Sequence, residues 1–273
     1  RSGVWYEGAA CRMRSAVENL ALFYKSEMGP SPPTSWAEVA EMGAALQESG
    51  DADYGFGLSG TTYDAYPVNS AFGGYVFGRG ADGNYDPTDV GVDSDGMVAS
   101  VDWIAEGVES GLIADTTDWD TAHALFEGGQ SPFIMAGPWA LDRIRESGIP
   151  YAVTTFPDGG VPFLGVLGFF VNALSENVLL AEAFLTEFVA TDEVMTELQT
   201  TGARPSAFPA VAAASDDPDL PAFNEAGLDA QPMPAIPEMA SVWGAWSDAP
   251  TIVINGDDTP ANALGAGAEQ VRG

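Results

Sequence analysis

Segments with helical periodicity alternate with short β-rich runs along most of this chain, and this alternation restricts the fold class more than any other feature. A helix is predicted over 35–50, because Ser-Trp-Ala-Glu at its start has the form of a capping box. Apolar residues recur at helical spacing over 97–108, which predicts a second helix with one buried stripe. Further helices are predicted at 120–128, 138–148, 177–189 and 191–202, and strands at 131–136, 151–156 and 161–172.

The alternation predicts an α/β protein with open sheets, and 273 residues suffice for one large domain or two lobes. We expect the strand at 161–172 to be buried and kinked by glycine, and the Pro-rich segment 206–237 to form short helices joined by turns. In such proteins, ligands bind in crevices between lobes or at strand ends.

The charge balance is strongly acidic. Forty Asp and Glu stand against nine Lys and Arg, giving a formal net charge of −31, and Lys25 is the single lysine. Such a field repels phosphate backbones and anionic lipid headgroups, so neither nucleic-acid binding nor electrostatic membrane docking is favoured. The ligand is therefore expected to be neutral or cationic. The acidic surface itself is interpreted as a solubility device, suited to a salty medium in which screening relieves repulsion.

Residues that carry redox or metal chemistry are scarce. Cys11 is the single cysteine, which excludes an intramolecular disulfide and a thiolate zinc cluster. His123 is the single histidine, and its helical context between two alanines favours no catalytic role. We therefore predict no metal site and no cofactor. The longest apolar stretch, 161–173, is too short and too interrupted to span a bilayer.

Other short motifs also lack the pattern their chemistry needs. The stretch 82–86 begins like a calcium loop but has no closing glutamate, so a hairpin turn is predicted there. The glycines over 73–80 do not form a phosphate-binding loop. Carboxylates are so abundant that no pair can be singled out as a glycosidase acid and nucleophile.

Aromatic residues beside turns are the feature most suggestive of a ligand site. A sugar ring has an apolar C–H face and an equator of hydroxyls, which suits aromatic platforms edged by carboxylates. Core packing is the alternative for each of these rings. From the residues alone, a carbohydrate-binding protein and a carbohydrate-active enzyme both stay open. The aromatics concerned are Tyr63, Tyr66, Trp139, Tyr151, Trp243 and Trp246.

A series of motifs keeps a common order and spacing from Ala16 to the end of the chain. The series is Ala16-Val17-Glu18, Leu20 to Tyr24, Pro32 to Trp36, Gly73-Gly74-Tyr75, Asn84-Tyr85-Asp86, Asp89-Val90-Gly91-Val92-Asp93, Gly137-Pro138-Trp139-Ala140, Pro162 to Leu167 and Met233 to Met239 ahead of Trp243. Taken together, these motifs resemble the maltose/maltodextrin-binding proteins, which are the extracellular solute-binding proteins of ABC sugar importers.

The resemblance implies the periplasmic-binding-protein-like fold, in which two α/β lobes hold a sugar in the cleft between them. It assigns 17–167 and 219–273 to the C-terminal lobe, 168–218 to the N-terminal lobe and 1–16 to a remnant of the N-terminal lobe. The opening part of such a protein has no counterpart here. We therefore expect an N-terminal truncation, with a nearly complete C-terminal lobe and a partial N-terminal lobe.

The resemblance also implies the site residues. By position, Glu18 matches an acidic sugar contact at the first crossover between the lobes. Tyr63, Trp139, Tyr151 and Trp243 match aromatic sugar contacts. No catalytic residue is implied.

Some positions depart from the family pattern and leave the exact sugar open. Asp64 replaces an aromatic residue, Thr61 replaces an acid and Ser247 replaces an arginine. Over 9–15 the spacing of an apolar strand is kept but its chemistry is lost, which a local reading-frame error or true divergence would produce. Because Arg12 and Arg14 would be costly to bury, we expect this segment to swing outward or stay disordered.

The implied function is that of a carrier with no enzymatic activity, which delivers maltose or a maltodextrin-like sugar to the membrane subunits of an ABC importer. A binder of another oligosaccharide such as trehalose and, from a different class, a secreted glycoside hydrolase are the alternatives. We expect a monomer in the periplasm or outside the cell, with a lipid anchor upstream of Arg1 as one option. Since a cleft needs both walls, we expect this chain to bind sugar poorly or not at all and to expose the apolar face of the helix at 177–189.

Overall fold

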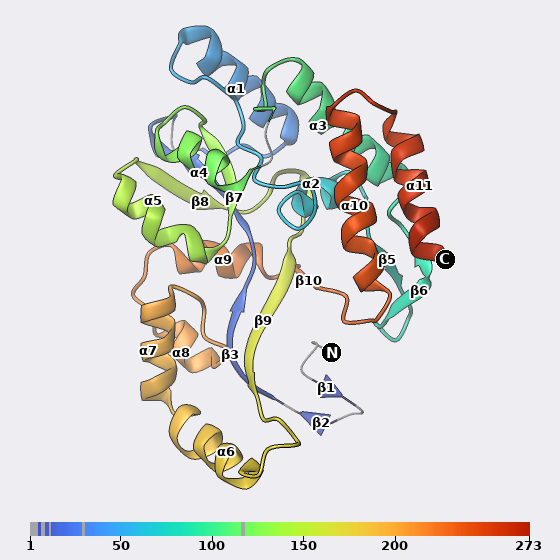
Figure 1. Ribbon diagram of the computed structural model, residues 1–273. Helices are drawn as coiled ribbons and strands as arrows, with labels where there is room; N and C mark the ends of the chain where they lie inside the picture. Colours follow the sequence, from blue (N-terminus) through green and yellow to red (C-terminus); the bar gives the residue numbers. More distant parts are fainter. Residues whose placement is uncertain (1–4, 7–8, 11, 29–30, 116–117) are drawn as a thin grey trace.

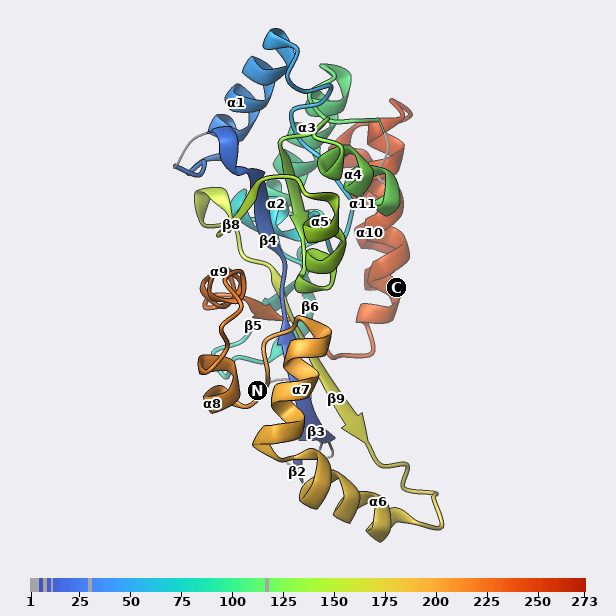
Figure 2. The ribbon, with the colours of Figure 1, turned by 90° about the vertical axis from the view of Figure 1, so that its left-hand side faces the viewer.

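The computed structural model describes residues 5–6, 9–10, 12–28, 31–115 and 118–273. Figure 1 shows a larger body and a smaller extension, which contains α6 (Val178–Phe184), α7 (Asp192–Gly202) and α8 (Pro209–Ala213). Two long antiparallel strands, β3 (Arg12–Glu18) and β9 (Phe163–Phe170), run between the two parts (Figures 1 and 2). The α/β class predicted from the sequence is confirmed.

The central sheet of the larger body has the strand order β7-β4-β8. Its middle strand β4 (Ala21–Lys25) pairs antiparallel with β7 (Phe133–Ala136) and with β8 (Tyr151–Thr154). Successive side chains of a strand point to opposite faces. Leu22 and Tyr24 accordingly join one buried cluster, with residues of α1 (Trp36–Ser49). Ala21 and Phe23 join another, beneath α4 (Trp119–Glu127) and α5 (Leu141–Ser147). The sheet is thus covered on both faces.

The helix predicted over 35–50 is confirmed as α1 (Trp36–Ser49). The Ser35 hydroxyl accepts from the Glu38 N–H, and Gly50 ends the helix in the left-handed conformation, with a φ of 81°. The Glu38 carboxylate reaches back over the cap, where it accepts chiefly from the N–H and hydroxyl of Thr34. The Asp158 carboxylate supplies a further cap, accepting from the Trp36 N–H at 2.8 Å.

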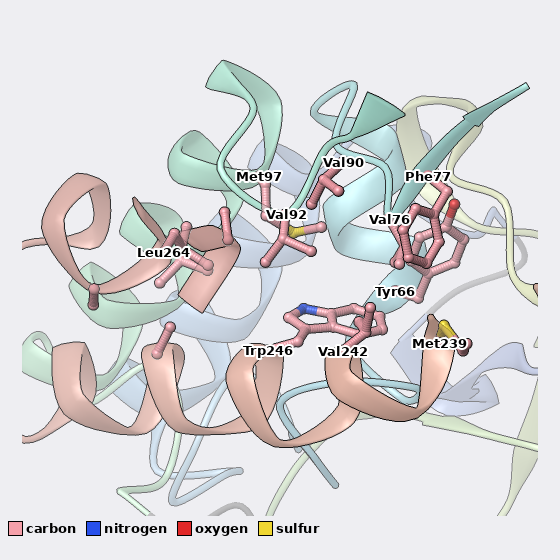
Figure 3. Close-up of a cluster of buried hydrophobic side chains, with 14 of the residues drawn as sticks. Tyr66, Val76, Phe77, Val90, Val92, Met97, Met239, Val242, Trp246 and Leu264 are labelled. Carbon is pink, nitrogen blue, oxygen red and sulfur yellow. The ribbon is translucent and has the colours of Figure 1, made fainter. Parts of the chain in front are cut away.

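A second part of the core of the larger body surrounds Trp246. This residue lies in α10 (Met239–Ile254), which packs against α11 (Pro260–Arg272) and α3 (Asp95–Glu109). In Figure 3, the side chains of Val242 and Trp246 point from α10 toward Val92 and Tyr66. Trp246 is 0% and Tyr66 1% exposed, so these two aromatics are core residues and not free platforms.

The other helices predicted from the sequence, and the strands predicted at 131–136 and 151–156, are found close to their predicted bounds. The turn predicted at 82–86 joins two antiparallel strands, β5 and β6, with Gly83 at a φ of 79°. The remaining elements are β1 (Trp5–Tyr6), β2 (Ala9–Ala10), β5 (Phe77–Arg79), β6 (Tyr85–Val90), β10 (Gln231–Pro232), α2 (Tyr66–Ala71), α4 (Trp119–Glu127), α5 (Leu141–Ser147), α9 (Leu220–Ala226), the 3-10 helices at Ser26–Met28, Pro138–Ala140 and Pro157–Gly159, and the π-helix at Leu185–Val189 that continues α6.

The prediction of a buried strand at 161–172 is wrong for most of its length. β9 is buried at Phe163, which pairs with Gln231 of β10, but Phe169 and Phe170 are 41% and 56% exposed. An apolar run is buried only where other elements cover it, and among the described residues the pairing of β9 with β10 ends at Leu164 while the pairing with β3 continues to Phe170. The expectation of turns and helices only at 206–237 is also corrected, since β10 is a short strand.

The segment of altered chemistry before Ala16 is ordered where it is described. β3 pairs with β9 from Arg12 onward, and Arg14 lies exposed on this open ribbon. The expectation that this segment swings out or stays disordered is therefore wrong, because a strand with an open face buries no charge there. Cys11 lies outside the described residues.

The extension presents an apolar surface, as expected for the helix at 177–189. Leu179, Phe184 and Phe188 are 81%, 56% and 63% exposed. Beside them lies a groove of about 880 Å³, lined by Met13, Phe169, Val171, Ala173, Val178, Leu179, Glu182, Ala183, Leu185 and Thr186.

Candidate functional site

Tyr63 is at the centre of the residues predicted to bind a ligand. It lies in the loop between the buried Leu58 and helix α2, partly buried itself. Its ring lies 6.4 Å from that of Trp139, tilted by 42°, and 6.1 Å from Phe163, nearly parallel to it. The structure therefore brings Tyr63 and Trp139 together at the start of β9.

The Gly-Pro-Trp sequence after β7 determines the position of Trp139. Pro138 opens a 3-10 helix directly after the strand. A Cβ atom at Gly137 would overlap the six-membered ring of Trp139, so the indole lies in space that only glycine leaves free. The ring stays partly exposed, packed between two core clusters.

Trp243 lies on α10, stacked on the core residue Trp246 with centroids 6.1 Å apart. Ser247, one turn further along α10, accepts a hydrogen bond of 3.5 Å from the Thr61 hydroxyl through its carbonyl. This contact joins two of the positions that depart from the family pattern. It also ties the Tyr63 loop to the turn of α10 that follows Trp243.

Glu18 is the last residue of β3 and pairs with Gly165 of β9. Its carboxylate accepts a hydrogen bond of 2.6 Å from Nε of Arg204. The negative charge of Glu18 also acts on the Tyr63 hydroxyl, whose pKa is raised by burial first and by Glu18 and Asp64 next. Both residues lie beside the start of β9, because Glu18 pairs with Gly165 and the Tyr63 ring packs on Phe163, two residues earlier in the strand. A neutral Tyr63 can both donate to and accept from a hydroxyl group.

Asp64, one of the departures from the family pattern, adds a second carboxyl to this region. Burial raises its pKa to about 6, and the nearby Ser59 hydroxyl opposes the shift. A carboxyl in this state accepts hydrogen bonds at neutral pH and donates one in mild acid.

Tyr151 lies apart from this group. It pairs with Lys25, whereas Ala136, which precedes the Gly-Pro-Trp turn, pairs with Ala21 at the other end of β4. The Tyr151 hydroxyl donates to Asp219 at 2.6 Å, and its ring packs 5.7 Å from Phe23. The predicted sugar contact at Tyr151 therefore stays a prediction.

Arg204 is the site residue that the sequence analysis missed. It follows α7 in the Gly-Ala-Arg-Pro sequence and reaches Glu18 from a segment 186 positions away. A cation before a proline is a weak signal by itself. This chain has only nine basic residues, however, so a search for the carboxylate partner of each one could have singled out Arg204.

His123 has a structural environment. It is fully buried in α4, with the Trp119 ring 4.1 Å away, and burial lowers its pKa to about 4. Within the described part of the chain, no group of three or more His, Cys, Asp or Glu is arranged to hold a metal ion. None of the helices described there is both long and apolar enough to cross a membrane.

The family model for bacterial extracellular solute-binding proteins matches residues 2–225. The chain belongs to this family. The match covers the ladder of β3 and β9 together with Glu18, Tyr63, Trp139 and Arg204.

Three relatives are similar along most of the chain. The galactooligosaccharide-binding protein of Bacillus subtilis (strain 168) is 29% identical over 94% of this chain. The maltodextrin-binding protein MdxE of the same strain is 26% identical over 88%, and the maltotriose-binding protein of Pyrococcus abyssi (strain GE5 / Orsay) is 25% identical over 89%. The aligned part of this chain spans 64%, 61% and 55% of these relatives, respectively.

Proposed function

We propose that this chain provides one wall of a site for a neutral oligosaccharide of the maltodextrin type. The observation that carries the proposal is the packing of Tyr63 against Trp139 and Phe163 at the start of β9, two residues before the strand position that pairs with Glu18. Aromatic rings suit the apolar C–H faces of glucose units, and a carboxylate accepts hydrogen bonds from hydroxyl groups at their equator. Trp243 extends the aromatic surface.

The proposed role is capture and delivery. Membership in the extracellular solute-binding family supports a carrier that works outside the cytoplasm and passes its sugar to the membrane subunits of an ABC importer. We propose that it does so as a monomer. We further propose that 17–167 and 219–273 form one lobe and 168–218 part of the other, with 1–16 as a remnant of the latter. The course of β3 and β9 between two bodies supports this division.

A galactooligosaccharide is the second candidate ligand. The relative at 29% identity carries that name, whereas two others are named for maltotriose and maltodextrin. At Thr61 and Ser247, this chain has short side chains where the family pattern has an acid and an arginine. Short side chains leave more room and fewer charged contacts, so they favour a sugar whose hydroxyl groups differ from those of maltose.

Glycoside hydrolysis is the alternative from a different class, and the names of the relatives argue against it, because each describes a binding protein. Product analysis after prolonged incubation with maltotriose tests this point. We expect unchanged sugar. Hydrolysis that scales with the amount of purified protein would overturn the carrier role.

Binding itself is tested by saturation-transfer NMR, which also detects millimolar affinities, with maltose, maltotriose, trehalose and a galactooligosaccharide. We expect transfer to the ring protons of a maltodextrin or of the galactooligosaccharide, and loss of that transfer in Trp139→Ala. Transfer to none of the four sugars would overturn the proposal. Transfer that persists unchanged in Trp139→Ala would move the site elsewhere.

A further inference from the structure

The main chain around Arg204 is fixed beside the strand that carries Glu18. After α7, Ala203 adopts a left-handed conformation with a φ of 48° and turns the chain back toward β3. The Val17 N–H then donates to the Pro205 carbonyl at 3.0 Å, and the Ala207 N–H donates to the Ser15 carbonyl at 3.1 Å. Arg204 is thereby held next to the last residue of β3.

The guanidinium of Arg204 is anchored on two sides. Its Nη1 donates to the Gly202 carbonyl at 3.0 Å, and its Nε donates to Oε2 of Glu18 at 2.6 Å. Both side chains of the ion pair are partly exposed, at 30% for Arg204 and 17% for Glu18. The pair is therefore reachable by a ligand.

Glu18 uses only one of its two carboxylate oxygens in this pair. Among the residues that the structure describes, Oε1 has no hydrogen-bond partner. On the opposite strand, a Cβ atom at Gly165 would approach Cγ of Glu18 to 3.0 Å and Oε1 to 3.5 Å. Glycine at 165 thus leaves room for the Glu18 side chain to lie across the ladder.

We propose that Arg204 is a positioning residue, which fixes the Glu18 carboxylate through Oε2 so that Oε1 is presented to a sugar hydroxyl. A charge-assisted hydrogen bond is short and directional, and an arginine with a second anchor holds one geometry. A carboxylate that is already fixed loses less rotamer freedom when the ligand binds. This inference rests on the proposed sugar-binding function.

A double-mutant cycle separates positioning from a merely structural contact. Maltotriose affinity is measured for the full chain, Arg204→Gln, Glu18→Gln and the double variant. We expect Arg204→Gln to weaken binding roughly threefold to tenfold in the presence of Glu18, and to have no further effect in Glu18→Gln. We expect Arg204→Lys to recover part of the loss, because its ammonium group keeps the charge but cannot make both hydrogen bonds.

Arg272→Gln is the matched control, since Arg272 also pairs with a carboxylate, that of Asp93, at 2.6 Å. We expect this variant to keep the parental affinity. An equal loss from Arg204→Gln in both Glu18 backgrounds, or no loss in either, would overturn the proposal.

A measurement without sugar keeps the inference separate from the proposed function. ¹³C relaxation of the Glu18 side chain reports whether the carboxylate is fixed. We expect an ordered Glu18 in the parent and a mobile one in Arg204→Gln, with Arg272→Gln unchanged. A Glu18 side chain that stays ordered in Arg204→Gln overturns the positioning role even if no sugar binds, whereas failure of every sugar to bind overturns the proposed function alone.

Discussion

The indole of Trp139 lies over Gly137, in space that a Cβ atom would fill. We therefore expect Gly137→Ala to displace the ring from Tyr63 and to weaken sugar binding by about 1–2 kcal/mol, as loss of an aromatic contact does. Titration monitored by tryptophan fluorescence checks this. Gly265→Ala is the control, because a Cβ there meets nothing within 4 Å inside α11. The control should gain roughly 0.5–1 kcal/mol of stability and keep its affinity.

Trp243 and Trp246 are stacked neighbours on α10 with different expected roles. Trp246→Ala should lower the free energy of unfolding by about 3–5 kcal/mol, because Trp246 is 0% exposed and its removal leaves a cavity. Trp243→Ala should leave the melting temperature nearly unchanged but weaken maltotriose binding by about 1–3 kcal/mol. Scanning calorimetry measures the stability of both variants, and titration followed by saturation-transfer NMR measures their affinity for maltotriose. A drop in melting temperature with unaltered affinity for Trp243→Ala would identify it as a core residue.

The pKa of Asp64, raised by burial to about 6, predicts a pH-dependent stability. A carboxyl whose pKa is higher in the folded chain binds its proton more tightly there. Its contribution to stability is therefore complete below the unfolded value of 3.8 and is lost as the pH rises through about 6. Asp64→Asn should gain stability relative to the parent between these pH values, by no more than about 3 kcal/mol.

Urea unfolding from pH 4 to pH 7 measures the difference between Asp64→Asn and the parent. Subtracting the parent is necessary because His123 titrates in the same pH range. Its pKa is lowered to about 4, so its contribution to the stability of the folded chain is lost as the pH falls, which is opposite to the effect of Asp64. Asp82→Asn is the matched control. Hydrogen bonds from the backbone and side chain of Asn84 lower the pKa of Asp82, so Asp82 titrates below 3.8 and the difference for this variant should stay nearly constant from pH 4 to pH 7. A difference for Asp64→Asn that does not vary with pH would contradict the assignment.

Local signals account for the elements that the sequence predicted well. The cap at Ser35, the left-handed Gly50 and the apolar spacing of α3 lie within the helices that they define. The extra cap from Asp158 has no such signal, because it comes from 122 positions away in the chain. Periodicity identifies an element but does not identify its distant partners.

The same limit explains what was missed at the site. Tyr63, Trp139 and Glu18 were predicted from family resemblance. The structure has all three beside the start of β9, and their role as sugar contacts stays a prediction. The role of Arg204 was not predicted because it depends on the return of the chain to β3 after α7. The exposure of β9 was not predicted because an apolar run gives no information about which other elements will cover it.

A variant at Tyr151 tests whether this residue makes a sugar contact or only a structural contact. Its hydroxyl donates to Asp219, which also accepts from Arg145 at 2.6 Å. We expect Tyr151→Phe to lose about 1–2 kcal/mol of stability, since the hydroxyl's bond to Asp219 and the bond of 3.3 Å that it accepts from Nε of Arg145 are removed while the ion pair stays. Thermal unfolding measures this loss. Maltotriose affinity measured beside it tests the predicted sugar contact, which requires a weaker affinity in the variant.

The net charge of −31 predicts that salt stabilises the folded chain. Compaction brings like charges together, and their repulsion falls as the screening length shrinks from about 8 Å at 0.15 M salt to about 3 Å at 1 M. Several of the few basic side chains are already paired, as Arg145 is with Asp217 and Asp219, so they neutralise little of the remaining surface. The melting temperature should therefore rise between about 0.05 and about 1 M salt, by similar amounts in NaCl and KCl.

Most of this rise in melting temperature should come below about 1 M, because screening is then nearly complete. A melting temperature that continues to rise at higher salt concentration would indicate stronger apolar burial. A melting temperature that falls with salt would mean that the ion pairs outweigh the repulsion.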